Sequence, residues 1–79
     1  MVNVHQVEVV VHVDDALSAD QRAKLVGSLM NHAGVEDAHF TAGLDHLLLV
    51  DYDRDRLHAQ DVLGYLRENH VAAELVGPV

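Results

Sequence analysis

The chain has 79 residues, of which 49% are hydrophobic, and it carries a formal charge of −8 and no cysteine. This length accommodates one small domain, residues 1–79, and the hydrophobic fraction excludes a disordered chain. Because the five Lys and Arg residues are scattered along the chain, no basic surface is available for nucleic acid or an anionic membrane. No apolar run is long enough to span a bilayer and no basic leader-like segment opens the chain, so we expect a cytoplasmic protein without membrane insertion.

The N-terminal half predicts a strand followed by a helix. Residues 2–13 are rich in valine, and their period-two pattern predicts a strand whose odd-numbered side chains face the core. Ser18 follows, with Gln21 three residues later, which is the spacing of a capping box at a helix start. We expect this helix to end before Gly34. Its predicted buried stripe consists of Leu25, Val26, Leu29, Met30 and Ala33.

The C-terminal half predicts a hairpin, a second helix and a last short strand. Residues 35–42 and 46–52 are the two hairpin strands, 58–69 the helix and 71–76 the final strand. Gly64 lies inside this helix at a cost of about 1 kcal/mol relative to alanine, which we attribute to a close helix contact. With short connections and right-handed crossovers, this order predicts an α+β ferredoxin-like βαββαβ sandwich. Its four-stranded antiparallel sheet carries both helices on one face.

Three short motifs stand at particular points of this order: Gly34-Val35 after the first helix, Tyr52-Asp53 before the second, and Ala73-Glu74 in the last strand. With them the chain resembles the heavy-metal-associated domain, the fold of small copper chaperones. In that family a helix ends in Gly-Val, a Tyr-Asp or Phe-Asp pair precedes the last helix, and the chain closes near Ala-Glu. The family's Met-x-Cys-x-x-Cys is missing, and its cysteine positions fall near Ser18 and Gln21. The resemblance therefore implies the fold and a role in metal trafficking, but not thiolate-based transfer of copper(I).

Seven histidines in an acidic chain suggest a different metal chemistry. In the predicted topology one end of the sheet gathers the end of the first strand, the hairpin turn and the loop before the last strand. We expect His12, His46 and His70 to meet there, with Asp14 or Asp15. Imidazole with carboxylate suits Zn(II), Ni(II) or Cu(II). The alternative is that these are ordinary surface and turn histidines, because no pair has a strong ligand spacing.

The helix-free sheet face is unexpectedly apolar. Such a face normally carries polar residues, and neighbouring apolar side chains on it indicate a surface that a monomer would tend to hide. The alternative is a scatter of exposed apolar residues, which monomers tolerate. The predicted interface consists of Val4, Val10, His39, Leu47, Leu49 and Val76.

These observations predict a small non-catalytic binding module. The first hypothesis is a metal-trafficking domain that binds a divalent ion through His and Asp if it binds metal at all. The second is a cysteine-free interaction or regulatory domain that forms a homodimer, or docks a protein partner, through its helix-free face. Nothing in the sequence marks a nucleophile, a phosphate loop or an enzyme pocket.

Overall fold

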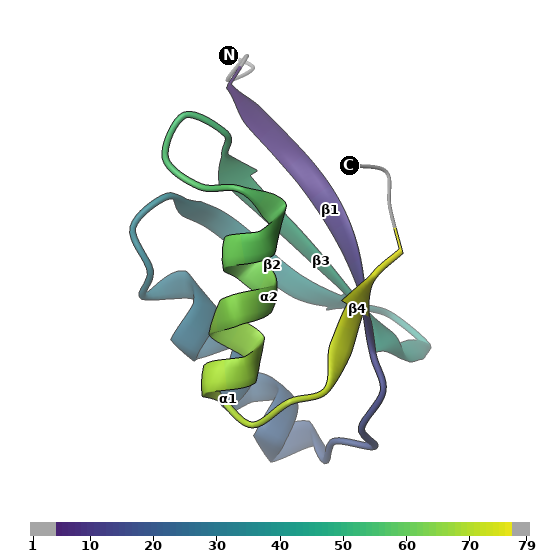
Figure 1. Cartoon of the computed structure of the whole chain (residues 1–79). Helices are drawn as coiled ribbons and strands as arrows, with labels where there is room; N and C mark the ends of the chain where they lie inside the picture. Colours follow the sequence, from purple (N-terminus) through teal and green to yellow (C-terminus); the bar gives the residue numbers. More distant parts are fainter. Residues whose placement is uncertain (1–4, 77–79) are drawn as a thin grey trace.

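The structure of the chain, a computed structural model, describes residues 5–76. Its elements follow the predicted order, and the fold is the predicted ferredoxin-like α+β sandwich (Figure 1). They are β1 (Gln6–Val13), α1 (Ala19–Met30), β2 (Val35–Thr41), β3 (Leu44–Asp53), α2 (Ala59–Glu68) and β4 (Ala73–Leu75). Within residues 5–76, neither helix is long and apolar enough to cross a membrane.

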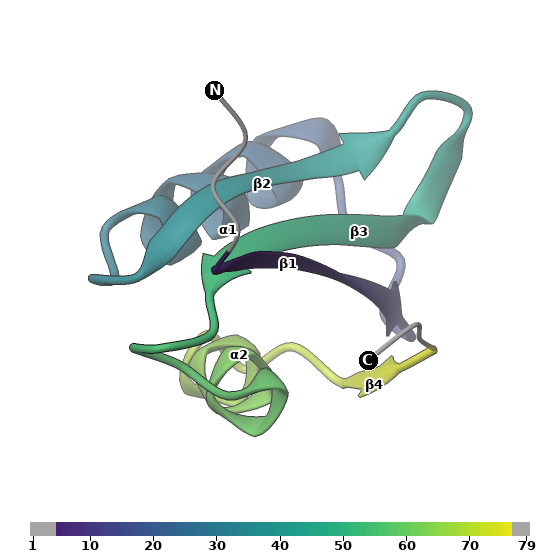
Figure 2. The same ribbon diagram turned by 90° about the horizontal axis from the view of Figure 1, so that it is seen from above.

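The four strands form one antiparallel sheet in the order β2-β3-β1-β4, with β1 and β3 at its centre (Figure 2). β1 pairs with β3 over seven residue pairs, from Gln6 opposite Asp53 to His12 opposite Leu47. β4 pairs with the end of β1, and this places Glu74 opposite His12. This register determines which side chains meet on the helix-free face.

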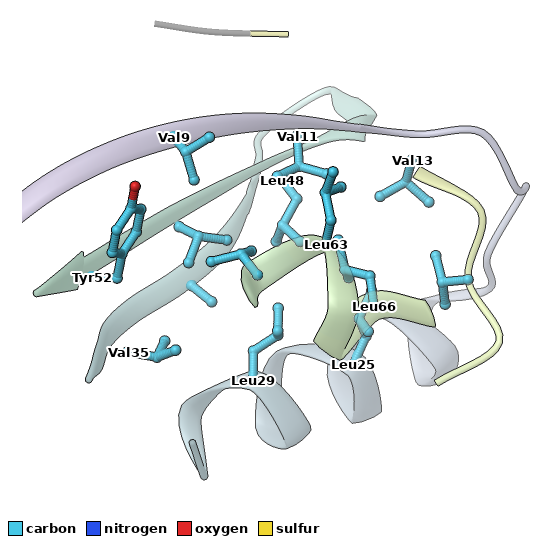
Figure 3. Close-up of a cluster of buried hydrophobic side chains, with 14 of the residues drawn as sticks. Val9, Val11, Val13, Leu25, Leu29, Val35, Leu48, Tyr52, Leu63 and Leu66 are labelled. Atoms are coloured by element: carbon cyan, nitrogen blue, oxygen red, sulfur yellow. The ribbon is translucent and has the colours of Figure 1, made fainter. Parts of the chain in front are cut away.

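The core lies between the sheet and the two helices (Figure 3). Val9, Val11 and Val13 of β1 are each at most 1% exposed, which confirms the odd-numbered inward face. Because side chains alternate along a strand, Glu8, Val10 and His12 of the same strand point away from the helices. Burying a Val or Leu side chain contributes about 1.5–3 kcal/mol, so this alternation fixes the register firmly. The remaining core includes Leu48 and Val50 of β3, Leu25 and Leu29 of α1, and Val62, Leu63 and Leu66 of α2.

Helix α1 starts as predicted and ends early. Ser18 is the N-cap, and its hydroxyl accepts a hydrogen bond from the Gln21 amide at 3.2 Å. The helix stops at Met30, with Asn31 as the C-cap. The predicted burial of Met30 and Ala33 is wrong, because Met30 is 43% exposed and Ala33 lies in the exposed turn after the helix.

Two glycines have opposite environments. Gly34 has φ of +94°, and a Cβ at this position would lie 2.9 Å from Cγ of Leu57, so only glycine fits there. Gly64 has no atom within 4 Å of a built Cβ. The predicted close helix contact at Gly64 is therefore wrong, and its missing side chain leaves open space.

Candidate metal centre

One group of potential ligands lies where the helix-free face meets the end of β1. His12 faces away from the helices, and the β1–β4 register brings Glu74 directly opposite it. Asp14, two residues further along, accepts a hydrogen bond from Nδ1 of His12 at 2.8 Å between N and O. One ligand atom from each of His12, Asp14 and Glu74 lies within 4.8 Å of the other two. Within residues 5–76 this is the one group of three such side chains close enough to share an ion.

The chemistry of this group suits a borderline or hard divalent cation. It offers one imidazole nitrogen and two carboxylate oxygens, which match Zn(II), Ni(II) and Cu(II) better than Cu(I). The side chains are accessible, with His12 41% and Asp14 50% exposed. An ion held here would be open to exchange rather than enclosed.

His46 lies beside the group without being one of its three members. Its ring stacks on that of His12, with centroids 5.9 Å apart and an angle of 17° between the planes. Its Nδ1 donates a hydrogen bond to the carbonyl oxygen of Val13 at 2.9 Å. The β2–β3 hairpin thus supplies a second imidazole next to the end of β1, as the sequence predicts.

The other two candidate ligands lie elsewhere. A carboxylate oxygen of Asp15 accepts a hydrogen bond from the Ala72 amide at 2.9 Å, so this side chain ties the loop after β1 to the segment before β4. His70 has φ of +61° and lines a pocket of about 350 Å³ beside α1. Neither residue belongs to the group formed by His12, Asp14 and Glu74.

Glu74 is the member that sequence reasoning missed. The resemblance places Ala73-Glu74 in the last strand, but the ligand role appears only when β4 is aligned with β1. Pairing Val11 with Leu75 and Val13 with Ala73 leaves Glu74 on the same face as His12. The alternation of side chains between the two faces of the last strand is the signal that could have revealed the position of Glu74.

Ser18 and Gln21, the positions near which the family's cysteines fall, bind each other here. The Ser18 amide donates to Oε1 of Gln21 at 2.8 Å, and the Ser18 hydroxyl accepts from the Gln21 amide. Together they form a complete capping box at the start of α1. These two side chains therefore stabilise a helix end.

The predicted interface residues lie on the helix-free face, where the structure describes them. Val10 pairs with Leu49, and Leu49 also pairs with His39. Val10, Leu47 and Leu49 are half-buried, whereas Val76 is 59% exposed. Val4 lies outside the described residues.

Comparisons with known proteins identify the fold. No protein-family model and no curated protein matches the chain. Among solved structures, it resembles the copper-binding domain of HMA7, a P-type ATPase, with a TM-score of 0.80 and 21% identity over 89% of this chain and 93% of that one. It also resembles oxidized MerP from Ralstonia metallidurans, with a TM-score of 0.80 and 11% identity over 91% of this chain and 99% of that one.

A third structure is the copper(I)-loaded first domain of the human copper chaperone for SOD1. Its TM-score is 0.75 and its identity 24%, over 91% of this chain and 94% of that one. The likeness spans almost the full length in each case, whereas the identities are low enough that it concerns the fold alone. The chain therefore has the fold of the heavy-metal-associated domains and carries no cysteine.

Proposed function

We propose that this chain is a small non-catalytic metal-binding module, which holds one divalent ion between His12, Asp14 and Glu74. The observation that carries the proposal is the proximity of one ligand atom from each of these side chains, within 4.8 Å of one another. The copper-binding domain of HMA7 and the copper(I)-loaded chaperone domain share the fold, and this likeness supports a role in handling metal.

The ligand set determines which ions the module would take. With imidazole and carboxylates in place of thiolates, we expect Zn(II), Ni(II) and Cu(II) to bind and Cu(I) to be discriminated against. A divalent cation would also relieve repulsion between Asp14 and Glu74 in a chain of charge −8. His46, whose ring stacks on that of His12, is our candidate for a fourth ligand.

Isothermal titration calorimetry with Zn(II) and Ni(II) tests this proposal. The chain contains a matched control, because His39 Nδ1 contacts Asp37 Oδ2 at 2.9 Å in a pair like that of His12 and Asp14 but without a third ligand. We expect one ion per chain for the wild type and for His39→Ala. His12→Ala and Glu74→Gln should each weaken binding at least about tenfold, which corresponds to about 1.4 kcal/mol.

Thermal unfolding with and without Zn(II) provides a second readout. An ion at a hundredfold excess over its dissociation constant should stabilise the folded state by about 2.7 kcal/mol. Equal affinity in His12→Ala and His39→Ala, or no binding by the wild type, would refute the site.

The second candidate function is protein interaction through the helix-free face. Leu47 and Leu49 on the central strand β3, together with Val10 on β1, are apolar side chains that remain partly exposed on this face, and this favours an interaction role. Self-association through this face stays a prediction from the sequence.

A further inference from the structure

The helix-free face is organised in rows that run across the strands. One row consists of His39, Leu49 and Val10, which are register partners on β2, β3 and β1. Val76 continues this row, since its amide donates to the Val10 carbonyl at 2.9 Å. The next row places Leu47 opposite His12. We call Val10, Leu47, Leu49 and Val76 the apolar patch.

An acidic row borders this patch on the other side. Asp37 pairs with Asp51, and Asp51 pairs with Glu8, so three carboxylates lie on neighbouring strands at one level. Like charges directly opposite each other across a sheet destabilise it. Within residues 5–76, no Lys or Arg forms an ion pair with any of the three. We call Glu8, Asp37 and Asp51 the acidic row.

All five Lys and Arg residues of the chain lie outside the described strands. The described strands contain no Lys or Arg, whereas α1, α2 and the loop between β3 and α2 contain all five of the chain. The five are Arg22, Lys24, Arg54, Arg56 and Arg67. Within residues 5–76 the strands of this face are therefore apolar and anionic, and His39, beside Asp37, is the one side chain in an ion-pair geometry with the acidic row.

We infer that the helix-free face docks a basic amphipathic helix of a partner protein. Leu and Val side chains of the helix would cover the apolar patch, and Lys or Arg along its border would pair with Glu8, Asp37 and Asp51. Adjacent strands are about 4.8 Å apart and a helix is about 10 Å across, so one helix covers the central strands β1 and β3. These two strands carry three of the four residues of the patch and two of the three acidic residues.

A second copy of the chain fits this face less well. Two such faces placed against each other would bury both acidic rows in one interface, and none of the described strands would supply a Lys or Arg to it. Each copy would also bring a charge of −8. The inference goes beyond the metal-binding proposal and does not depend on it, because the acidic row is separate from His12, Asp14 and Glu74.

Fluorescence anisotropy with a synthetic helix tests the inference on the whole chain. The probe is a labelled peptide of about 18 residues, about five turns, with Leu along one side and Lys along both borders. One control peptide replaces every Lys by Glu, and another scrambles the order so that the apolar side is lost. We expect only the Lys and Leu peptide to bind, with an affinity that falls as salt is added.

Two charge-matched variants locate the binding surface. Glu8→Gln, Asp37→Asn and Asp51→Asn together change the net charge from −8 to −5 (−8 + 3). The control variant makes the same change on the helices and a loop, with Asp20→Asn, Asp55→Asn and Glu68→Gln. We expect the first variant to weaken peptide binding at least about tenfold and the second to leave it within about threefold. Relief of cross-strand repulsion should leave the first variant as stable as the wild type or more so, so lost binding would not reflect unfolding.

Three results would overturn the inference. The first is equal loss of binding in the two charge variants, and the second is no binding of the Lys and Leu peptide by the wild type. The third is a wild-type dimer in sedimentation velocity that Leu47→Lys plus Leu49→Lys converts to monomer, since this would assign the face to a second copy. We expect a monomer for both chains, with circular dichroism as the check that the double variant is folded. Running the binding assay with EDTA separates its outcome from that of the metal site.

Discussion

His46 donates a hydrogen bond from Nδ1 to the carbonyl oxygen of Val13, which lies 33 residues away along the chain, at 2.9 Å. Because a carbonyl oxygen can only accept, Nδ1 carries the proton and Nε2 keeps its lone pair. Metal-ligating histidines are commonly held in this way, with one ring nitrogen donating to a carbonyl and the other free to bind. In the neutral ring, this hydrogen bond leaves Nε2 as the nitrogen available to accept or to ligate.

The first prediction concerns His46 as the fourth ligand. His46→Ala should weaken Zn(II) binding about tenfold and no more than His12→Ala does, because the group formed by His12, Asp14 and Glu74 stays intact. It should also lower the free energy of unfolding by about 1 kcal/mol in the presence of EDTA, since the hydrogen bond to Val13 is lost. Calorimetry measures the first effect and urea unfolding the second. Unchanged Zn(II) affinity with reduced stability would show that His46 has only a structural role.

The sequence predicts the sheet and its core well, because one alternating pattern determines both the buried and the exposed face of a strand. Alternating valines give β1 its inward face, and the same parity places His12 outside. The end of α1 is predicted less well, because the apolar helical spacing continues to Ala33 although the helix is already capped at Asn31. Local capping decides where a helix stops, and apolar periodicity alone does not show it.

The candidate site is predicted only in part, for a geometric reason. The topology places several loops at one end of the sheet, but it does not say on which side of the sheet each side chain emerges. His70, with φ of +61°, lines the pocket beside α1, whereas His12 lies on the opposite side of the sheet. Glu74 becomes a neighbour of His12 only through the register of β4, which pairs the two residues directly.

The second prediction follows from the capping box at the start of α1. Ser18→Ala removes the acceptor of the Gln21 amide and should lower the free energy of unfolding by about 1 kcal/mol. Zn(II) affinity should not change, because Ser18 holds a helix end and no ion. Ser28→Ala is the comparison within the same helix, where the hydroxyl accepts from the Asn69 side-chain amide and does not cap the helix. Loss of Zn(II) binding in Ser18→Ala alone would contradict this assignment.

The third prediction concerns the two glycines inside the helices. Gly27 and Gly64 have open space at the Cβ position, so alanine adds helix propensity without a clash. Gly27→Ala and Gly64→Ala should each stabilise the chain by about 0.5–1 kcal/mol. In a domain of this size, 1 kcal/mol raises the melting temperature by roughly 4–8 °C. Thermal unfolding monitored by circular dichroism measures the shift.

Gly34→Ala is the matched control and should have the opposite sign. Its backbone has φ of +94°, and the new methyl group would lie 2.9 Å from Cγ of Leu57. We expect a loss of more than about 1 kcal/mol, because strain and a clash with the core combine. A stabilised Gly34→Ala, or a destabilised Gly64→Ala, would contradict the environments that the structure assigns to these glycines.

The fourth prediction concerns Tyr65, whose ring stacks face to face on that of His32 with centroids 3.6 Å apart. Burial raises the pKa of the Tyr65 phenol above its ordinary value of 10.0, and the negative charges of Asp61 and Glu68 raise this pKa further. At a pH between the pKa of Tyr65 in the unfolded chain and its raised pKa in the folded chain, the unfolded chain releases the phenol proton and the folded chain keeps it. The free energy of unfolding should therefore fall as the pH rises above 10, through the folded pKa.

The ultraviolet absorbance of tyrosinate, compared between the wild type and Tyr65→Phe, isolates this titration. Glu68→Gln removes one of the repelling charges without touching Asp61, whose carboxylate accepts from the His58 amide at the start of α2. It should therefore move the pKa of Tyr65 back toward 10.0, although burial, as the larger cause, would keep it above that value. A Tyr65 pKa that did not respond to Glu68→Gln would leave burial and Asp61 as its causes, and a pKa at or below 10.0 would contradict the prediction altogether.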